Sequence, residues 1–148
     1  MVSERPDPEA WTCEVRWKDR RIPAVKAVAK HIFDIRVGAT LRGLEATVDG
    51  WVAREGGALV LRREDGDERF RLAPLTRKIQ WDAASSRDQP PTEEERGAFG
   101  RLEAALREAG GAESGSGALP ARVVGPVRDV ENGGLRVMEV RAFFAGSR

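Results

Sequence analysis

Residues 44–75 read LEATVDGWVAREGGALVLRREDGDERFRLAPL, and this stretch decides the fold. From Leu44 to Val52, apolar side chains alternate with polar ones, which predicts a strand with one buried face. Two further strands are predicted over 58–63 and 68–75. We therefore expect three consecutive strands joined as hairpins.

Short turns separate these predicted strands. Gly56-Gly57 predicts a tight turn. Asp65-Gly66 predicts a hairpin turn of type I′, whose two central residues need positive φ. Residues 76–91 that follow the third strand predict a loop.

The next segment carries the signals of a helix over 92–109. Thr92 and Glu95 form a capping box, in which each side chain accepts a backbone hydrogen bond at the helix start. Apolar residues then recur at helical spacing, namely Phe99, Leu102, Leu106 and Ala109. Residues 110–119 are rich in glycine and serine and predict a flexible linker.

Two more strands are predicted over 121–130 and 135–144, with Asn132-Gly133 as the hairpin turn between them. Residues 40–148 thus have the element order β-β-β-α-β-β. This order resembles the OB-fold superfamily, and no specific family is identified. The resemblance implies an OB-like five-stranded small barrel. The fold class expected for the chain is mainly β with two helices (α+β).

Residues 1–39 predict an N-terminal arm, a strand and a helix packed on the barrel. The first ten residues contain two prolines and predict an irregular segment, whereas residues 11–17 predict a short strand. Pro23 marks the start of a helix. An alternative makes the N-terminal half a ferredoxin-like α/β sandwich, as in heavy-metal-associated domains, but their paired cysteines are missing because Cys13 has no partner.

Composition excludes several classes of site. The 148 residues include one cysteine and one histidine, which excludes a disulfide framework and any multi-cysteine or poly-histidine metal site. No cofactor is indicated, and Cys13 is expected to be a buried structural thiol. No apolar run is long enough for membrane insertion, and no export signal is visible, so the cytoplasm is the expected location.

Basic and aromatic residues supply the candidate binding positions. The first set would lie on the face of the barrel that OB-folds use for binding, and comprises Trp51, Arg62, Arg69, Phe70, Arg71, Arg77, Lys78 and Trp81. A second basic surface comprises Arg16, Trp17, Lys18, Arg20, Arg21, Lys26 and Lys30. No residue is identified as catalytic.

The functional hypothesis is a non-catalytic binding or assembly module that contacts another protein or itself. The alternative is single-stranded nucleic-acid binding through the arginine and tryptophan face. Residues 43–81 carry seven acidic and seven basic side chains, and this zero net charge disfavours a phosphate groove. A small enzyme of unknown chemistry is a second alternative.

Overall fold

The computed structural model describes residues 3–7, 12–16, 21–34, 41–82, 84–110, 117–130 and 134–146. Within them lie two helices, α1 (Val25–Asp34) and α2 (Glu93–Glu108). The strands are β1 (Ser3–Asp7), β2 (Thr12–Arg16), β3 (Leu44–Glu55), β4 (Ala58–Arg63), β5 (Arg69–Pro74), β6 (Trp81–Asp82), β7 (Arg87–Asp88), β8 (Leu119–Arg128), β9 (Arg136–Val140) and β10 (Ala142–Ala145).

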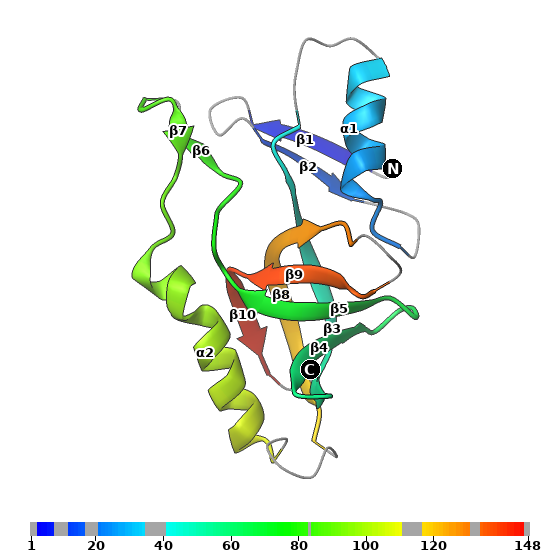
Figure 1. Ribbon diagram of the computed structural model, residues 1–148, viewed down its shortest axis with the longest axis vertical. Coiled ribbons are helices and arrows are strands. Elements are labelled where there is room, and N and C mark those ends of the chain that lie inside the picture. Colours follow the sequence, from blue (N-terminus) through cyan, green and yellow to red (C-terminus); the bar gives the residue numbers. More distant parts are fainter. Residues whose placement is uncertain are drawn as a thin grey trace.

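Five of these strands form a closed barrel (Figure 1). β3 pairs with β4, β4 with β5, β5 with β9, β9 with β8, and β8 with β3. The β5–β9 pairing is parallel, and the other four are antiparallel. The predicted mainly β small barrel with two helices is confirmed, and its closed form is compatible with an OB-like fold.

The barrel interior is apolar because the inward position of each strand carries an aliphatic or aromatic side chain. Val52, Leu61 and Phe70 have 0% of their surface exposed. Leu102 and Leu106 of α2 belong to the same core cluster, so the helix packs against the barrel (Figure 1). Each such buried side chain stabilises the fold by roughly 1.5–3 kcal/mol.

A β-bulge divides the predicted strand over 135–144 into β9 and β10. Val127 pairs with Met138, whereas Val124 pairs with Ala142. Three residues of this strand therefore lie opposite two residues of β8, which is the count of a bulge. The bulge turns the chain, so that β9 reaches β5 while β10 stays on β8.

Two glycines permit the close approach of strands that barrel closure requires. A Cβ atom at Gly125 would overlap the carbonyl oxygen of Glu139 in the bulge. A Cβ atom at Gly50 would overlap the carbonyl oxygen of Arg62, at the point where β3 begins to pair with β4 while it is still paired with β8. Glycine within a strand commonly marks such an approach.

The two predicted turns differ in geometry. Gly56 and Gly57 have φ values of 57° and 81°, as the prediction of a tight turn requires. The type I′ prediction for Asp65-Gly66 is wrong, because neither residue has positive φ. The β4–β5 connection is a longer loop that the Arg63 N–H closes by donating to the Glu68 carbonyl at 3.0 Å, and longer loops built on type I turns need no positive φ at these positions.

The N-terminal strands form a sheet of their own. Ser3–Asp7 pairs with Thr12–Arg16, so the prediction of an irregular first segment is wrong there. The ferredoxin-like alternative is also wrong, because β2 pairs with β1 while β3 pairs with β4 and β8.

Side chains from the barrel hold the start of α1. Asp129 accepts hydrogen bonds from the Val25 and Lys26 N–H groups at 2.8 and 2.9 Å, and so satisfies donors that a helix start leaves unpaired. Arg136 donates to the carbonyls of Ile22 and Pro23 at 2.7 and 3.1 Å. These contacts fix the segment before α1 on the β8–β9 end of the barrel.

The capping box of α2 is confirmed, and it also connects the helix to the barrel. Glu95 receives the Thr92 N–H at 3.1 Å and the Lys78 ammonium at 2.9 Å, and Arg141 lies 3.4 Å from its second oxygen. The buried face runs through Ala98, Leu102 and Leu106. Ala109, which the sequence assigned to this face, is exposed because it follows the last helical turn.

Replacement of the bulge glycine tests how closely the strands must approach. Gly125→Ala should lower the free energy of unfolding by about 2–4 kcal/mol, because backbone must move to admit the methyl group. Gly100→Ala on α2 is the matched control, since nothing lies within 4 Å of its Cβ position. The control should raise stability by roughly 0.5–1 kcal/mol. Urea unfolding measures the free energy of unfolding of both variants. Equal changes in the two would contradict the close approach of the strands at the bulge.

Acid should weaken the attachment of α2 through Glu95. Partial burial raises the pKa of Glu95, but hydrogen bonds from Lys78 and Thr92 outweigh it and lower the pKa to about 2 from 4.5. The ionised carboxylate therefore stabilises the fold above pH 4.5, and this stabilisation is lost as the pH falls toward 2. Glu95→Gln should cost about 1–2 kcal/mol at neutral pH and remove part of this acid sensitivity. A pH series of urea unfolding curves measures both effects. Glu108→Gln, at the exposed end of α2, should change neither the free energy of unfolding at neutral pH nor its acid sensitivity.

Candidate functional site

Three neighbouring strands and the end of a fourth present one continuous surface outside the barrel. We call it the outer face, and it comprises Trp51, Arg62, Arg69, Arg71, Leu135 and Val137. Trp51 is the cross-strand partner of Arg62, which is the partner of Arg69. Arg71 is the partner of Val137 on β9. Cross-strand partners point to the same side of a sheet, so these side chains form one surface.

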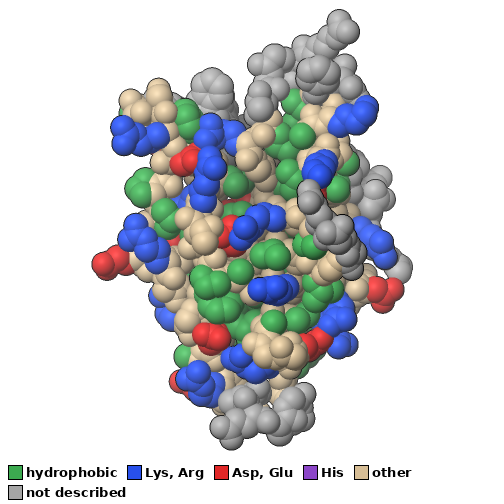
Figure 2. Space-filling model, viewed as in Figure 1, with side chains coloured by type: hydrophobic (Ala, Val, Ile, Leu, Met, Phe, Trp, Pro, Cys, Tyr) green, Lys and Arg blue, Asp and Glu red, His purple; other side chains and the backbone are tan. Residues whose placement is uncertain are grey.

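The outer face is exposed and mixed in character. Trp51 is 48% exposed and Leu135 is 37% exposed, which places both among the exposed large hydrophobic side chains. The Arg62 side chain is 60% exposed. Figure 2 shows hydrophobic and basic side chains intermingled over β5 and β9, with acidic side chains mostly near the margins of that view.

One carboxylate serves two of the three arginines of the outer face. Glu55 lies 2.9 Å from the Arg62 Nε and also pairs with Arg69. Arg71 is exposed and makes no hydrogen bond or ion pair within the part of the chain that the structure describes. Three arginines against one carboxylate leave the surface with a net charge of +2. Such a surface attracts an anionic ligand, and its aromatic and aliphatic side chains offer apolar contact.

No family model, curated protein or solved structure matches this chain. Among the described residues, no group of three or more His, Cys, Asp or Glu side chains is placed to hold a metal ion. No helix in the described ranges is long and apolar enough to cross a membrane.

The structure separates the eight candidates of the first set. Trp51, Arg62, Arg69 and Arg71 come together on the outer face. The placement of Phe70 on this face is wrong, because the side chain is 0% exposed in the barrel core and cannot stack on a ligand. It alternates with Arg69 and Arg71 along β5, so it points inward with Leu72.

The remaining three candidates lie beyond β5. Lys78 is only 8% exposed and is paired with Glu95, so it is a structural cation and not a surface contact. Arg77 is exposed and pairs with Asp88. Trp81 belongs to β6, which pairs with β7 where the sequence predicted a loop, and the Arg42 guanidinium lies 3.8 Å from its ring centroid.

The second basic surface is described only in part. Arg21, Lys26 and Lys30 are exposed. Arg16 lies in β2 with its side chain not described, and Trp17, Lys18 and Arg20 lie outside the described residues. The prediction that Cys13 is buried is wrong, because this free thiol is exposed on β2.

Leu135 and Val137 were not among the candidates. Their alternation with Arg136 and Met138 is visible in the sequence. The missing information is that β9 lies beside β5, a contact between segments about 66 positions apart, as in the register Arg71 with Val137. In an OB-like barrel the third and fifth strands are neighbours. The element order was therefore the signal that could have identified Leu135 and Val137.

Proposed function

We propose that this chain is a non-catalytic binding or assembly module that contacts another protein, or a second copy of itself, through the outer face. The observation that carries the proposal is the exposed Trp51 set among Arg62, Arg69 and Arg71. Tryptophan and arginine are the residues most enriched at the energetic centres of protein interfaces. Val137 of β9 and the exposed Leu135 just before this strand extend the apolar part of the surface.

The backbone and several side chains of the outer face are already ordered, so binding would cost little conformational entropy. The outer face lies on hydrogen-bonded strands of a closed barrel, so its backbone is already ordered. Glu55 holds Arg62 and Arg69 in place through its two oxygens. Preorganised side chains lose less freedom on association, which leaves more of the contact energy for affinity.

The charge of the outer face indicates the kind of partner. Its net charge of +2 favours an acidic surface surrounding an apolar centre that covers Trp51. Arg71 is the residue best placed to form a new ion pair, since its guanidinium makes no ion pair with any described residue. Charge-assisted contacts of this kind set specificity and association rate.

Replacement of the two most available side chains tests the proposal. Trp51→Ala and Arg71→Gln should each weaken partner binding about tenfold or more, the effect expected of an interface centre. Both side chains are exposed, so the free energy of unfolding should change by less than about 1 kcal/mol. Light scattering over a range of concentrations measures self-association, and Arg107→Gln on α2 is the matched control. If Arg107→Gln weakened self-association as strongly as Arg71→Gln does, the result would contradict the proposal that the outer face is the interface.

A photo-crosslinking side chain at position 71, compared with one at position 107, tests for a different protein in the native host. A protein adduct specific to position 71 would support the proposal. Adducts of equal yield at both positions would contradict it. So would an adduct to nucleic acid alone, which would instead favour the second candidate function.

Single-stranded nucleic-acid binding is that second candidate, and the sorting of charges in space favours it. The sequence assigned no net charge to residues 43–81. In the fold, Glu45 pairs with Arg141 and Glu68 pairs with Arg63 and Arg136, away from the outer face. Binding of oligo(dT) would then quench Trp51 fluorescence and weaken with salt, with a slope of about −0.7 per phosphate contact. No quenching at low salt would exclude this candidate.

A further inference from the structure

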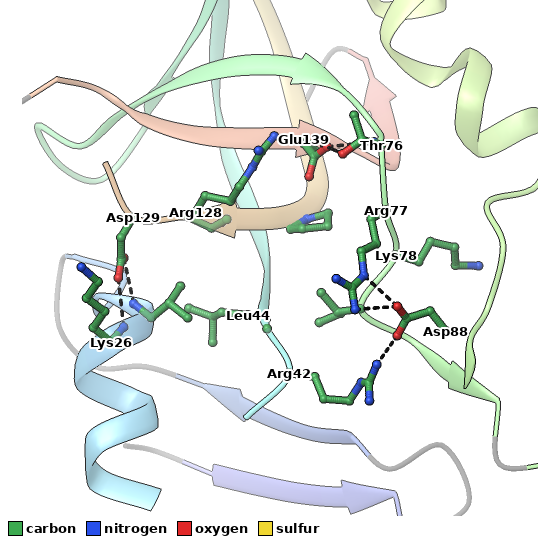
Figure 3. Close-up of a pocket in the computed structure, with 15 residues that line it drawn as sticks. Lys26, Arg42, Leu44, Thr76, Arg77, Lys78, Asp88, Arg128, Asp129 and Glu139 are labelled. Atoms are coloured by element: carbon green, nitrogen blue, oxygen red, sulfur yellow. Dashed lines mark hydrogen bonds and ion pairs between the residues drawn. The ribbon is translucent and has the colours of Figure 1, made fainter. Parts of the chain in front are cut away.

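A cleft of about 480 Å³ lies beside α1 at the β8–β9 end of the barrel (Figure 3). Its walls come from six places in the sequence: the start of α1, the residues that lead into β3, the segment after β5, β7, the end of β8, and Glu139 of β9. A volume of this size is in the range that holds a small organic molecule. The outer-face residues Arg62, Arg69 and Arg71 do not line it.

The middle of the cleft is apolar. Val25, Leu44, Ile79 and Val127 contribute aliphatic side chains from α1, β3, the segment after β5, and β8. Figure 3 shows Leu44 between the two charged ends of the cleft. A ligand lying across this surface would bury its own apolar part, which is the main source of affinity in small-molecule sites.

At one end of the cleft a single carboxylate lies between two arginines. Asp88 accepts from the Arg77 Nε at 2.7 Å and also pairs with Arg42 (Figure 3). Desolvation raises the pKa of Asp88, but hydrogen bonds from Arg42 and Arg77 outweigh it and lower the pKa. Asp88 is therefore ionised at neutral pH, and two cations against one anion leave this end positive.

At the opposite end the carboxylate of Asp129 serves the start of α1. Asp129 lies 3.5 Å from Arg136, and Lys26 is beside it in Figure 3. Partial burial raises the pKa of Asp129, but the Lys26 and Val25 N–H groups and the charges of Arg136 and Lys26 outweigh it and lower the pKa. The carboxylate is thus committed to the helix start.

The other charged residues of the cleft do not cancel the positive charge of the Arg42–Arg77 end. Glu139 is 3% exposed and accepts from the Thr76 N–H at 2.8 Å, while Arg128 lies 3.3 Å from it. Its negative charge is therefore matched locally. Lys78 points away from the cleft toward α2, where it pairs with Glu95 (Figure 3).

We propose that this cleft binds a small amphipathic anion, a molecule with an apolar ring or short chain that carries a carboxylate or a phosphate ester. The aliphatic walls receive the apolar part, and the Arg42–Arg77 pair receives the anionic group. Arginine forks bind both carboxylate and phosphate oxygens in pairs. Asp88 occupies the position of that anionic group in the unliganded chain, so the ligand competes with it.

Three naphthalene probes test the ligand class by isothermal titration calorimetry on the full chain. These are 1-naphthyl phosphate, 1-naphthoate and the neutral 1-naphthamide. Both anions should bind saturably at one site per chain, and the amide at least about tenfold more weakly. The order of the two anions distinguishes a phosphate from a carboxylate ligand. No saturable binding of either anion, or equal binding of the amide, would overturn the proposal.

Variants assign the binding to the cleft. Arg77→Gln, with a side chain 70% exposed, should fold normally and weaken anion binding about fivefold or more. Asp88→Asn should strengthen binding about threefold, because the internal competitor loses its charge. Arg71→Gln on the outer face is the matched control and should leave probe binding unchanged. An Arg77→Gln variant that binds like the wild type, or an Arg71→Gln variant that loses binding equally, would contradict the cleft. These two variants also separate this site from the proposed partner-binding function.

Discussion

The parallel pairing of β5 with β9 is the contact on which the rest of the structure depends. It joins Leu72 to Met138 and Arg71 to Val137, and it converts a sheet with two open edges into a closed barrel. Open strand edges present unpaired backbone groups that favour association with other chains. Closure removes those edges. It also brings Leu135 and Val137 beside the arginines of β5, so the outer face exists only in the closed form.

Closure in turn depends on a few local features of β8 and β9. Gly125 admits the bulge, and the bulge directs β9 toward β5 while β10 remains on β8. The side chains of Arg136 and Asp129, from β9 and from the end of β8, hold the segment that leads into α1. The same connection therefore closes the barrel, fixes the N-terminal helix and forms one end of the cleft.

Local features of the fold could be predicted from the sequence. The alternation from Leu44 onward and the Thr92–Glu95 capping box each rest on neighbouring residues, and the structure confirms both the strands and the helix start. The order of elements was enough to predict a small barrel. The type I′ prediction at Asp65-Gly66 failed because a dipeptide does not determine how many residues the loop contains.

The candidate site was only partly predictable, because it depends on pairings between distant segments. Alternation along β5 distinguishes Phe70 from Arg69 and Arg71, yet composition alone grouped all three. The neighbours Leu135 and Val137 came from a strand about 66 positions away. The pairing of Ser3–Asp7 with Thr12–Arg16 and the β6–β7 ribbon were missed for a similar reason, since prolines and polar residues concealed short strands.

Amide hydrogen exchange measured by NMR on β5 and β9 tests barrel closure most directly. If the parallel pairing closes the barrel, the hydrogen-bonded amides of both strands are protected to the free energy of global unfolding, as are those of β3 and β4. If β5 and β9 exchange rapidly while β3 and β4 remain protected, the sheet is open at that pairing. The outer face would then not exist as a surface.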